Sequence, residues 1–279
     1  MAITVNTNMA SFTAQKALNS ATNKMNTAME RMSTGLRINS SKDDAAGMAV
    51  STKLDYKVSS LNVAKDNAQM GASMLDTTEG VLDVIKSNLV RVRDLTEQAA
   101  NGTYGSDALA AIQTEVSARL TEITRVAESS EFNGKKILNG DTTGVQLQVG
   151  ITGDANSQIS LNNDIFADAT ATGLIGTYDL DSVFESDTNA RAFLSSLDTA
   201  IDTVTERKTL IGGSQSAITS AMDAAEVMST NLTSSSSLIK DADIAEESSN
   251  YIKNQILQQA SATLLATANQ APSIAVNLV

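Results

Sequence analysis

Apolar residues recur along most of this chain at alternating steps of three and four positions, the spacing of a coiled-coil seam. Near the N-terminus this spacing is kept by Ala14, Leu18, Ala21, Met25, Ala28 and Met32. A second stripe near the C-terminus contains Leu257, Ala260, Leu264, Ala268 and Ala271. Neither predicted helix can bury its stripe alone, so each needs a partner helix. The two ends therefore predict a protein that assembles end to end with copies of itself, with Leu18, Met25, Met32, Leu257 and Leu264 in the polymerisation seam.

The first half of the chain predicts two further helices. Between residues 45 and 100 a Leu or Ala stands at every seventh position from Leu54 to Leu89. This helix would be roughly 80 Å long at ~1.5 Å per residue. A second helix over 106–128 follows a short Gly-containing turn, so it should return antiparallel to the first.

In the second half, another seven-residue repeat runs from Leu197 to Leu232 and predicts a helix over 190–232. Polar Lys208 and Gln215 interrupt its second seam position, where polar residues commonly set the register. The serines at 234–237 are predicted to form a hinge before a last helix over 241–270.

The region from residue 132 to 189 lacks the helical pattern of the rest of the chain. Asn133-Gly134 and Asn139-Gly140 are strong turn pairs. Around residues 145–149 and 158–161, apolar residues alternate with polar ones, which predicts a small β-hairpin.

These elements predict a mainly α protein, a rod of long helices in a coiled coil and bundle, with a small β-hairpin region at its tip. Residues 1–44 and 235–279 are expected to form a terminal coiled-coil domain. Residues 45–234 are expected to form a helical rod domain that includes the hairpin region at about 132–189.

Composition narrows the possible functions. The net charge of −12 argues against nucleic acid and against an anionic membrane surface as partners. There is no His and no Cys, which removes the commonest general base, the usual zinc ligands and thiol catalysis. No basic start followed by an apolar stretch is present, so no cleaved signal peptide is expected. We expect no enzyme activity, no cofactor and no metal.

Two acidic groups are candidates for cation-binding or catalytic sites. Asp241, Asp243, Glu246 and Glu247 form the densest group, and Asp43 and Asp44 form a carboxylate pair. Neither has the spacing of a known metal loop, so helix capping and salt bridges between helices are the favoured interpretation.

Several segments resemble bacterial flagellin. The run from Ala28 to Gly47, AMERMSTGLRINSSKDDAAG, is close to the signature of that family. DADIAEES from Asp241 and QILQQA from Gln255 also fit, as does FNGKKILNG from Phe132. Compared with many flagellins, the variable stretch at 141–190 is very short.

The resemblance implies a filament subunit for swimming motility, with both termini in an inner coiled-coil domain (D0) and the middle in a rod-like domain (D1). It implies export through the flagellar type III apparatus to the outside of the cell. The implied partners are copies of the same chain, the flagellar cap and hook-junction proteins, and an export chaperone.

The resemblance also implies a site for the Toll-like innate receptor. Family members that this receptor recognises use an Arg-Val-Arg-x-Leu stretch and a Glu on the next helix, which match Arg91 to Leu95 and Glu115 here. Three other readings stay open: a hook–filament junction protein of the flagellum, an enzyme, and a secreted helical effector or adhesin.

Overall fold

The computed structural model describes residues 7–276, and side chains as far as residue 270. It divides into two compact units. Unit 1 contains the chain up to Val58 and from Thr230 onward, and unit 2 contains Ser59–Ser229. The domain limits expected near residues 44 and 235 stay a prediction.

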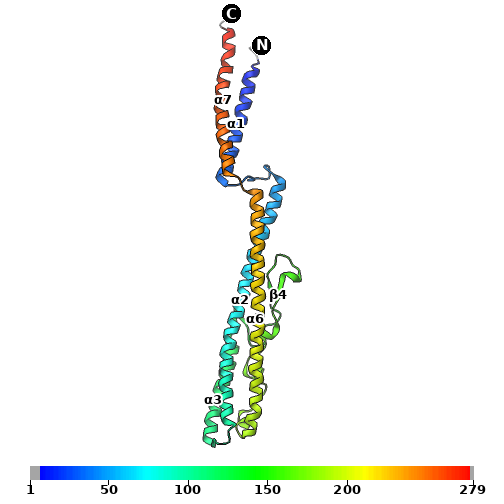
Figure 1. The fold of residues 1–279 in the computed structure, drawn as a ribbon, viewed down its shortest axis with the longest axis vertical. Helices are drawn as coiled ribbons and strands as arrows, with labels where there is room; N and C mark the ends of the chain where they lie inside the picture. The colour runs from blue at the N-terminus through cyan, green and yellow to red at the C-terminus, as the bar shows by residue number, and fades with distance from the viewer. Residues whose placement is uncertain (1–6, 277–279) are drawn as a thin grey trace. The chain divides into compact units, whose positions relative to one another are not determined.

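Long helices dominate the described chain, which confirms the predicted fold class (Figure 1). They are α1 (Met9–Thr34), α2 (Ala45–Ala99), α3 (Ser106–Ser129), α6 (Asp187–Lys240) and α7 (Ile244–Val276). Short elements fill the region between α3 and α6. They are β1 (Glu131–Phe132), β2 (Lys135–Lys136), β3 (Gln146–Gln148), η1 (Ala155–Ser157), β4 (Gln158–Ser160), η2 (Asn163–Phe166), α4 (Ala171–Ile175) and α5 (Leu180–Val183).

The ends of α1 follow from local hydrogen bonding. The Asn8 side chain accepts from the Ser11 N–H at 3.1 Å and caps the first turn. Gly35 takes a left-handed φ of 73°, and its N–H bonds the Arg31 carbonyl at 2.8 Å. Gly35 is therefore the stop that the sequence predicted.

The predicted hinge at 234–237 is wrong, because α6 continues through it to Lys240. The serine hydroxyls find partners that leave the helix intact. Ser235 bonds the Asn231 carbonyl one turn earlier at 2.8 Å, and Ser236 donates to Asp55 on α2 at 2.7 Å. The Ser235 bond to the carbonyl one turn earlier disfavours a helix only slightly, so these serines do not interrupt α6.

The core of unit 2 confirms the seven-residue repeats. Most of the aliphatic side chains predicted on the seams of α2, α3 and α6 are fully or almost fully buried, whereas Leu54 and Leu232 at the ends of their series are half-buried. The largest of them are Leu75, Leu82, Leu89, Leu120, Ile123 and Leu197. Removing such side chains from water is the main force holding the three helices together, at roughly 1.5–3 kcal/mol for each large residue.

Polar pairs flank this core and set the register of α2 against α6. Arg93 contacts Asp198 at 2.6 Å, and Lys208 contacts Asp83 at 2.6 Å. Gln215 bonds Asp76 at 2.7 Å, and Lys65 pairs with Glu226. In each pair the two residue numbers add to 291, as one antiparallel register requires.

Lys208 and Gln215, which interrupt the predicted seam, are therefore two of the register-setting residues. The hydrogen bond to Asp83, together with nearby Glu79, raises the pKa of Lys208. Half-exposed pairs of this kind add little stability, so their main effect is to select one alignment of the two helices.

A buried guanidinium joins α6 to the non-helical segment. Arg207 is only 7% exposed and donates to the carbonyls of Ala167 at 2.8 Å and Asp168 at 3.0 Å. Burial lowers its pKa, against the opposing effect of Asp168 and Asp164. These hydrogen bonds compensate the loss of water around the charge.

Two hairpins form, one around the predicted turn pair Asn133-Gly134 and one from the two segments whose alternation predicted strands. β1 pairs with β2 across Asn133 and Gly134, whose φ angles are 48° and 78°. β3 pairs antiparallel with β4, with Leu147 opposite Ile159.

The position of the second hairpin corrects the expectation that it lies at the tip of the rod. It packs along α2 instead, where the Asn67 amide donates to the Gln148 carbonyl at 3.3 Å. Leu147 lies against Gly71, and the absence of a Cβ at Gly71 makes the room. Gly71 is thus a packing site within the helix.

In unit 1, α1 and α7 pair along a seam that is largely polar. On the α1 side Ala21 and Ala28 are buried. On the α7 side the buried residues recur every seven positions and are Glu247, Asn254 and Ser261. Gln258 bonds Thr22 at 2.9 Å, and Asn8 bonds the Ala268 carbonyl at 2.7 Å.

This seam is also loosely filled. A hollow of about 330 Å³ lies between the two helices, with Ala28, Arg31, Glu247 and Asn254 among its lining residues. Hydrogen bonds, buried small side chains and half-buried apolar residues such as Leu18 and Met25 together hold α1 to α7.

Substitution at Gly71 tests the packing of the hairpin. Gly71→Val should destabilise unit 2 by about 1–3 kcal/mol, because the new side chain overlaps Leu147. Gly80→Ala is the matched control on the same helix, since nothing lies within 4 Å of its added Cβ. It should stabilise by roughly 0.5–1 kcal/mol. Urea unfolding of both variants measures the difference, and equal effects would refute the packing role.

Filling the hollow in the α1–α7 seam should strengthen unit 1. Asn254→Leu places an aliphatic side chain in the hollow and should stabilise the pair by about 1–2 kcal/mol. Gln259→Leu, on the exposed side of α7, should give no such gain. Amide hydrogen exchange in α1 and α7 provides the measurement. Slower exchange in both variants, or in neither, would contradict the seam described above.

Candidate assembly interface

The connectors that join the terminal helices to α2 and α6 are tied together by their backbones. The Arg37 N–H bonds the Lys240 carbonyl at 2.6 Å, and the Ala242 N–H bonds the Gly35 carbonyl at 2.9 Å. Between these bonds, Leu36 and Asp241 form an antiparallel bridge. The Arg37 guanidinium adds a bond to the Ile239 carbonyl at 2.7 Å. The two connectors therefore hold the end of α1 and the start of α7 next to each other.

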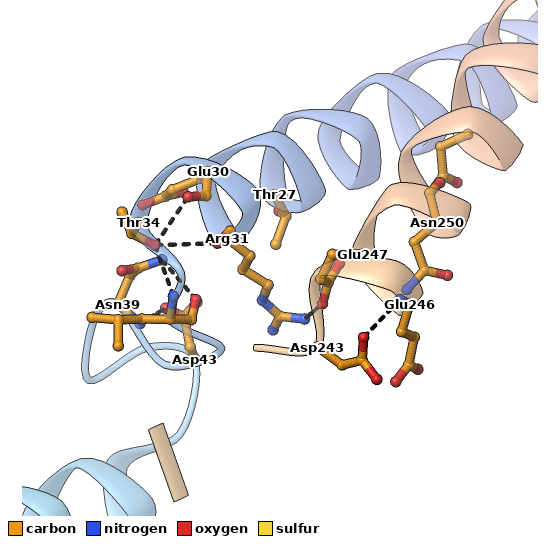
Figure 2. Close-up of polar contacts among 12 residues, drawn as sticks. Thr27, Glu30, Arg31, Thr34, Asn39, Asp43, Asp243, Glu246, Glu247 and Asn250 are labelled. Atoms are coloured by element: carbon orange, nitrogen blue, oxygen red, sulfur yellow. Dashed lines mark hydrogen bonds and ion pairs between the residues drawn. The ribbon is translucent and has the colours of Figure 1, made fainter. Parts of the chain in front are cut away.

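Acidic residues organise both connectors by capping, as the sequence predicted. The Asp43 carboxylate accepts from the Ser40 hydroxyl at 3.0 Å and from the N–H groups of Ser40 and Asn39. These bonds, the Ser40 hydroxyl first, lower the pKa of Asp43. Asp243 accepts from the N–H groups of Ala245 at 2.8 Å and Glu246 at 3.3 Å and so begins α7 (Figure 2).

Glu247 has a different role from its acidic neighbours. Its carboxylate bonds Arg31 of α1 at 2.9 Å across the seam (Figure 2). Its side chain is only 10% exposed, so this pair is better shielded from water than the other ion pairs of the described chain. Within residues 7–276 no acidic cluster is arranged to hold a metal ion.

Asp55 connects α2 to α6 within unit 1. It accepts from Ser236 at 2.7 Å and from Lys240 at 2.9 Å, both on α6. These two bonds, with that of Lys240 the larger effect, lower the pKa of Asp55.

Most of the large aliphatic residues of α7 are exposed, whereas Leu265 is half-buried. Ile252 is 55% exposed, Ile256 is 60% exposed and Leu264 is 62% exposed. Ile252, Ile256 and Leu257 line a shallow apolar groove on α7. We call Ile252, Ile256, Leu257 and Leu264 the outer face of α7. A helix pair that buries polar residues and exposes aliphatic ones is the reverse of a normal amphipathic arrangement.

The structure separates the five predicted seam residues into two groups. On α1, Leu18, Met25 and Met32 are half-buried, and the Ser248 hydroxyl of α7 contacts the Met32 sulfur at 3.9 Å. On α7, Leu257 and Leu264 lie on the outer face.

Leu257 and Leu264 therefore do not pack on α1 within this chain, and their place in the polymerisation seam stays a prediction. The row through Glu247, Asn254 and Ser261 occupies the contact, because Arg31 and Thr22 of α1 supply partners for Glu247 and Gln258. Ala271 of the predicted stripe lies outside the described side chains.

The residues matched to a receptor site also fall into an exposed group and a buried one. Arg91 on α2 contacts Glu115 on α3 at 3.0 Å, and both are at the surface of unit 2. Arg119 extends this group by bonding Asn88 at 3.2 Å. Leu95 is only 3% exposed and belongs to the core, so it is not available for direct contact. The seven-residue series of α2 passes through Leu89 and Thr96 and not through Leu95, so it did not indicate that Leu95 is buried.

None of the helices described between residues 7 and 276 has the length and hydropathy of a membrane span.

Comparison with known proteins identifies two matching regions. Residues 5–143 match the bacterial flagellin N-terminal helical region. Residues 194–279 match the bacterial flagellin C-terminal helical region. Together the matches cover both groups of long helices and leave out the hairpin of β3 and β4.

Relatives align over almost their whole length. The flagellin of Bacillus subtilis (strain 168) is 36% identical over 303 residues, with 99% of each chain covered. The flagellar filament 30.7 kDa core protein of Treponema maltophilum is 34% identical over 275 residues, with 95% of each covered. A solved structure of a flagellar hook-associated protein from Vibrio parahaemolyticus shares the fold, with a TM-score of 0.60 and 17% identity over 71% of this chain and 99% of that one. The matched regions and the full-length relatives place this chain in the bacterial flagellin family.

Proposed function

We propose that this chain is a structural subunit that polymerises into the helical filament of the bacterial flagellum. The observation that supports this function is the outer face of α7. Four large aliphatic side chains remain exposed there while the α1–α7 contact is polar. Surfaces of this kind on a soluble chain mark sites of protein contact.

The free energy of burying the outer face gives a physical basis for assembly. Each fully covered Ile or Leu contributes roughly 1.5–3 kcal/mol. Association must offset the loss of translational and rotational freedom, which costs several kcal/mol. Four such residues in each copy, repeated along a polymer, are sufficient for that purpose. A contact between different surfaces of two copies that does not close into a ring produces a helical filament.

The flagellin family is structural, and this role needs no catalysis. We further propose that the chain is extracellular, exported without a cleaved signal peptide, and that it contacts the flagellar cap, hook-junction proteins and an export chaperone. The polar and loosely filled α1–α7 seam supports this route, because a weak contact is easily opened for passage.

The hook–filament junction role is the less supported alternative. The hook-associated protein from Vibrio parahaemolyticus is 17% identical and so speaks for the fold alone. The full-length relatives from Bacillus subtilis and Treponema maltophilum are a flagellin and a filament core protein. These favour a subunit of the filament itself.

We also propose that Arg91 and Glu115 form part of a recognition site for the Toll-like innate receptor. The supporting observation is that the ion pair bridges α2 and α3 at the surface, with side chains 45% and 38% exposed. Leu95 would contribute only by holding α2 in place.

The outer face can be disabled without touching the seam. The double variant Ile252→Asn/Ile256→Asn should abolish filament formation in seeded polymerisation, because polar side chains would replace aliphatic ones at the proposed contact. Its helical circular dichroism should match that of the unaltered chain. Electron microscopy and sedimentation measure the polymer.

Gln259→Asn is the control, since it exchanges one exposed polar residue of α7 for another. It should polymerise normally. Filaments from the double variant at the usual yield would remove the outer face from the assembly contact.

Receptor recognition can be tested on unit 2. Arg91→Ala should reduce receptor signalling about tenfold, the effect of losing ~1.4 kcal/mol of binding. Arg125→Ala is the matched control, an exposed Arg of α3 paired only with Glu122 on its own helix. Leu95→Ala should instead destabilise the fold by about 2–5 kcal/mol. Equal signalling by the Arg91 and Arg125 variants would refute the proposed site.

A further inference from the structure

Sulfur chemistry in this chain is confined to methionine. The sequence holds ten Met and no Cys, and it also lacks Trp and His. The thioether is therefore the group that mild oxidants attack most readily here. Whether a given thioether reacts depends on its exposure to solvent.

The described methionines range from exposed to buried, with Met25, Met32, Met48 and Met222 of intermediate exposure. Met9 is 68% exposed, Met29 is 51%, Met70 is 56% and Met228 is 49%. Met74, one turn of α2 after Met70, is only 6% exposed and lies in the core. Met74 is therefore a buried control close to the exposed Met70.

Three of the four exposed methionines lie near other exposed apolar residues in the sequence. Met70 follows Val63 by seven positions on α2, and Val63 is 55% exposed. Met228 follows Val227, which is 62% exposed, on α6. Met9 is near Phe12, which is 71% exposed, on α1. These thioethers belong to apolar surface that a polymer would cover.

We propose that Met9, Met29, Met70 and Met228 are peroxide-oxidation sites, and that their sulfoxides block addition of the subunit to a polymer. The second part rests on the proposed filament function. In the reaction, the thioether sulfur attacks one oxygen of hydrogen peroxide. The O–O bond breaks and an S–O bond forms, so that sulfur is oxidised and peroxide is reduced to water after proton transfer.

The physical effect is a change from an apolar to a strongly polar side chain. A sulfoxide oxygen is a hydrogen-bond acceptor, and burying it without a donor is unfavourable. The free monomer leaves it in water, so folding is unaffected, but a subunit contact would have to desolvate it. Methionine sulfoxide is reduced back by sulfoxide reductases, which makes the block reversible.

The first measurement maps oxidation independently of assembly. Monomer is treated with increasing hydrogen peroxide, and mass spectrometry of its peptides reports the fraction of sulfoxide at each Met. Met9, Met29, Met70 and Met228 should react well before Met74. Reaction of Met74 at the same peroxide dose would overturn the site assignment.

The second measurement concerns assembly. Untreated and oxidised monomers of the full chain are seeded under the same conditions, and polymer is measured by sedimentation. Oxidation should raise the critical concentration about tenfold, and incubation with methionine sulfoxide reductases should restore the original value. Unchanged assembly after complete oxidation of the four residues would overturn the proposed block. Failure of the untreated chain to polymerise would instead count against the filament function.

Variants locate the effect. Met9→Leu/Met29→Leu/Met70→Leu/Met228→Leu keeps apolar side chains of similar volume, and peroxide should leave its polymer yield unchanged relative to its own untreated sample. Met74→Leu should stay as sensitive as the unaltered chain. If the fourfold variant loses assembly to peroxide as the unaltered chain does, the block lies elsewhere and the proposal fails. Recovery with reductase in the unaltered chain decides the question even if the fourfold variant folds poorly.

Discussion

The exchange of polar and apolar sides on the terminal helix pair is the constraint on which the rest of unit 1 depends. Asn254 and Ser261 are buried in the contact, whereas Ile256 and Leu264 face solvent. An isolated pair gains little free energy from such a seam, since few apolar atoms leave the water. Its aliphatic residues become useful only when another protein covers them. The stability of the terminal helices is therefore coupled to assembly.

Unit 2 has the same seven-residue periodicity but buries its apolar residues. Its apolar residues face inward and supply stability within one chain, while polar residues at the edge choose the alignment. The two units thus divide the tasks of a subunit. Unit 2 buries its apolar residues among parts of α2, α3 and α6, whereas unit 1 leaves the outer face of α7 exposed.

Periodicity predicted the elements that bury their own apolar face. The seven-residue repeats around Leu82 and Ile211 gave the correct helices, and alternation around Leu147 gave the correct strands. It failed where burial is decided by polar partners. Leu257 fits an apolar stripe, but Arg31 pairs with Glu247 and turns a different side of α7 inward. A prediction from the spacing of apolar residues alone does not take such polar pairs into account. The location of the hairpin also escaped prediction, because it depends on an absent Cβ at Gly71.

The shared register of the four pairs between α2 and α6 has a mechanical consequence. A force along the helix axes would strain Arg93–Asp198, Lys208–Asp83 and the other two pairs at the same moment, together with the whole apolar seam. A force that peels the helices apart would break them one after another. The pair should therefore resist shear along the helix axes better than peeling.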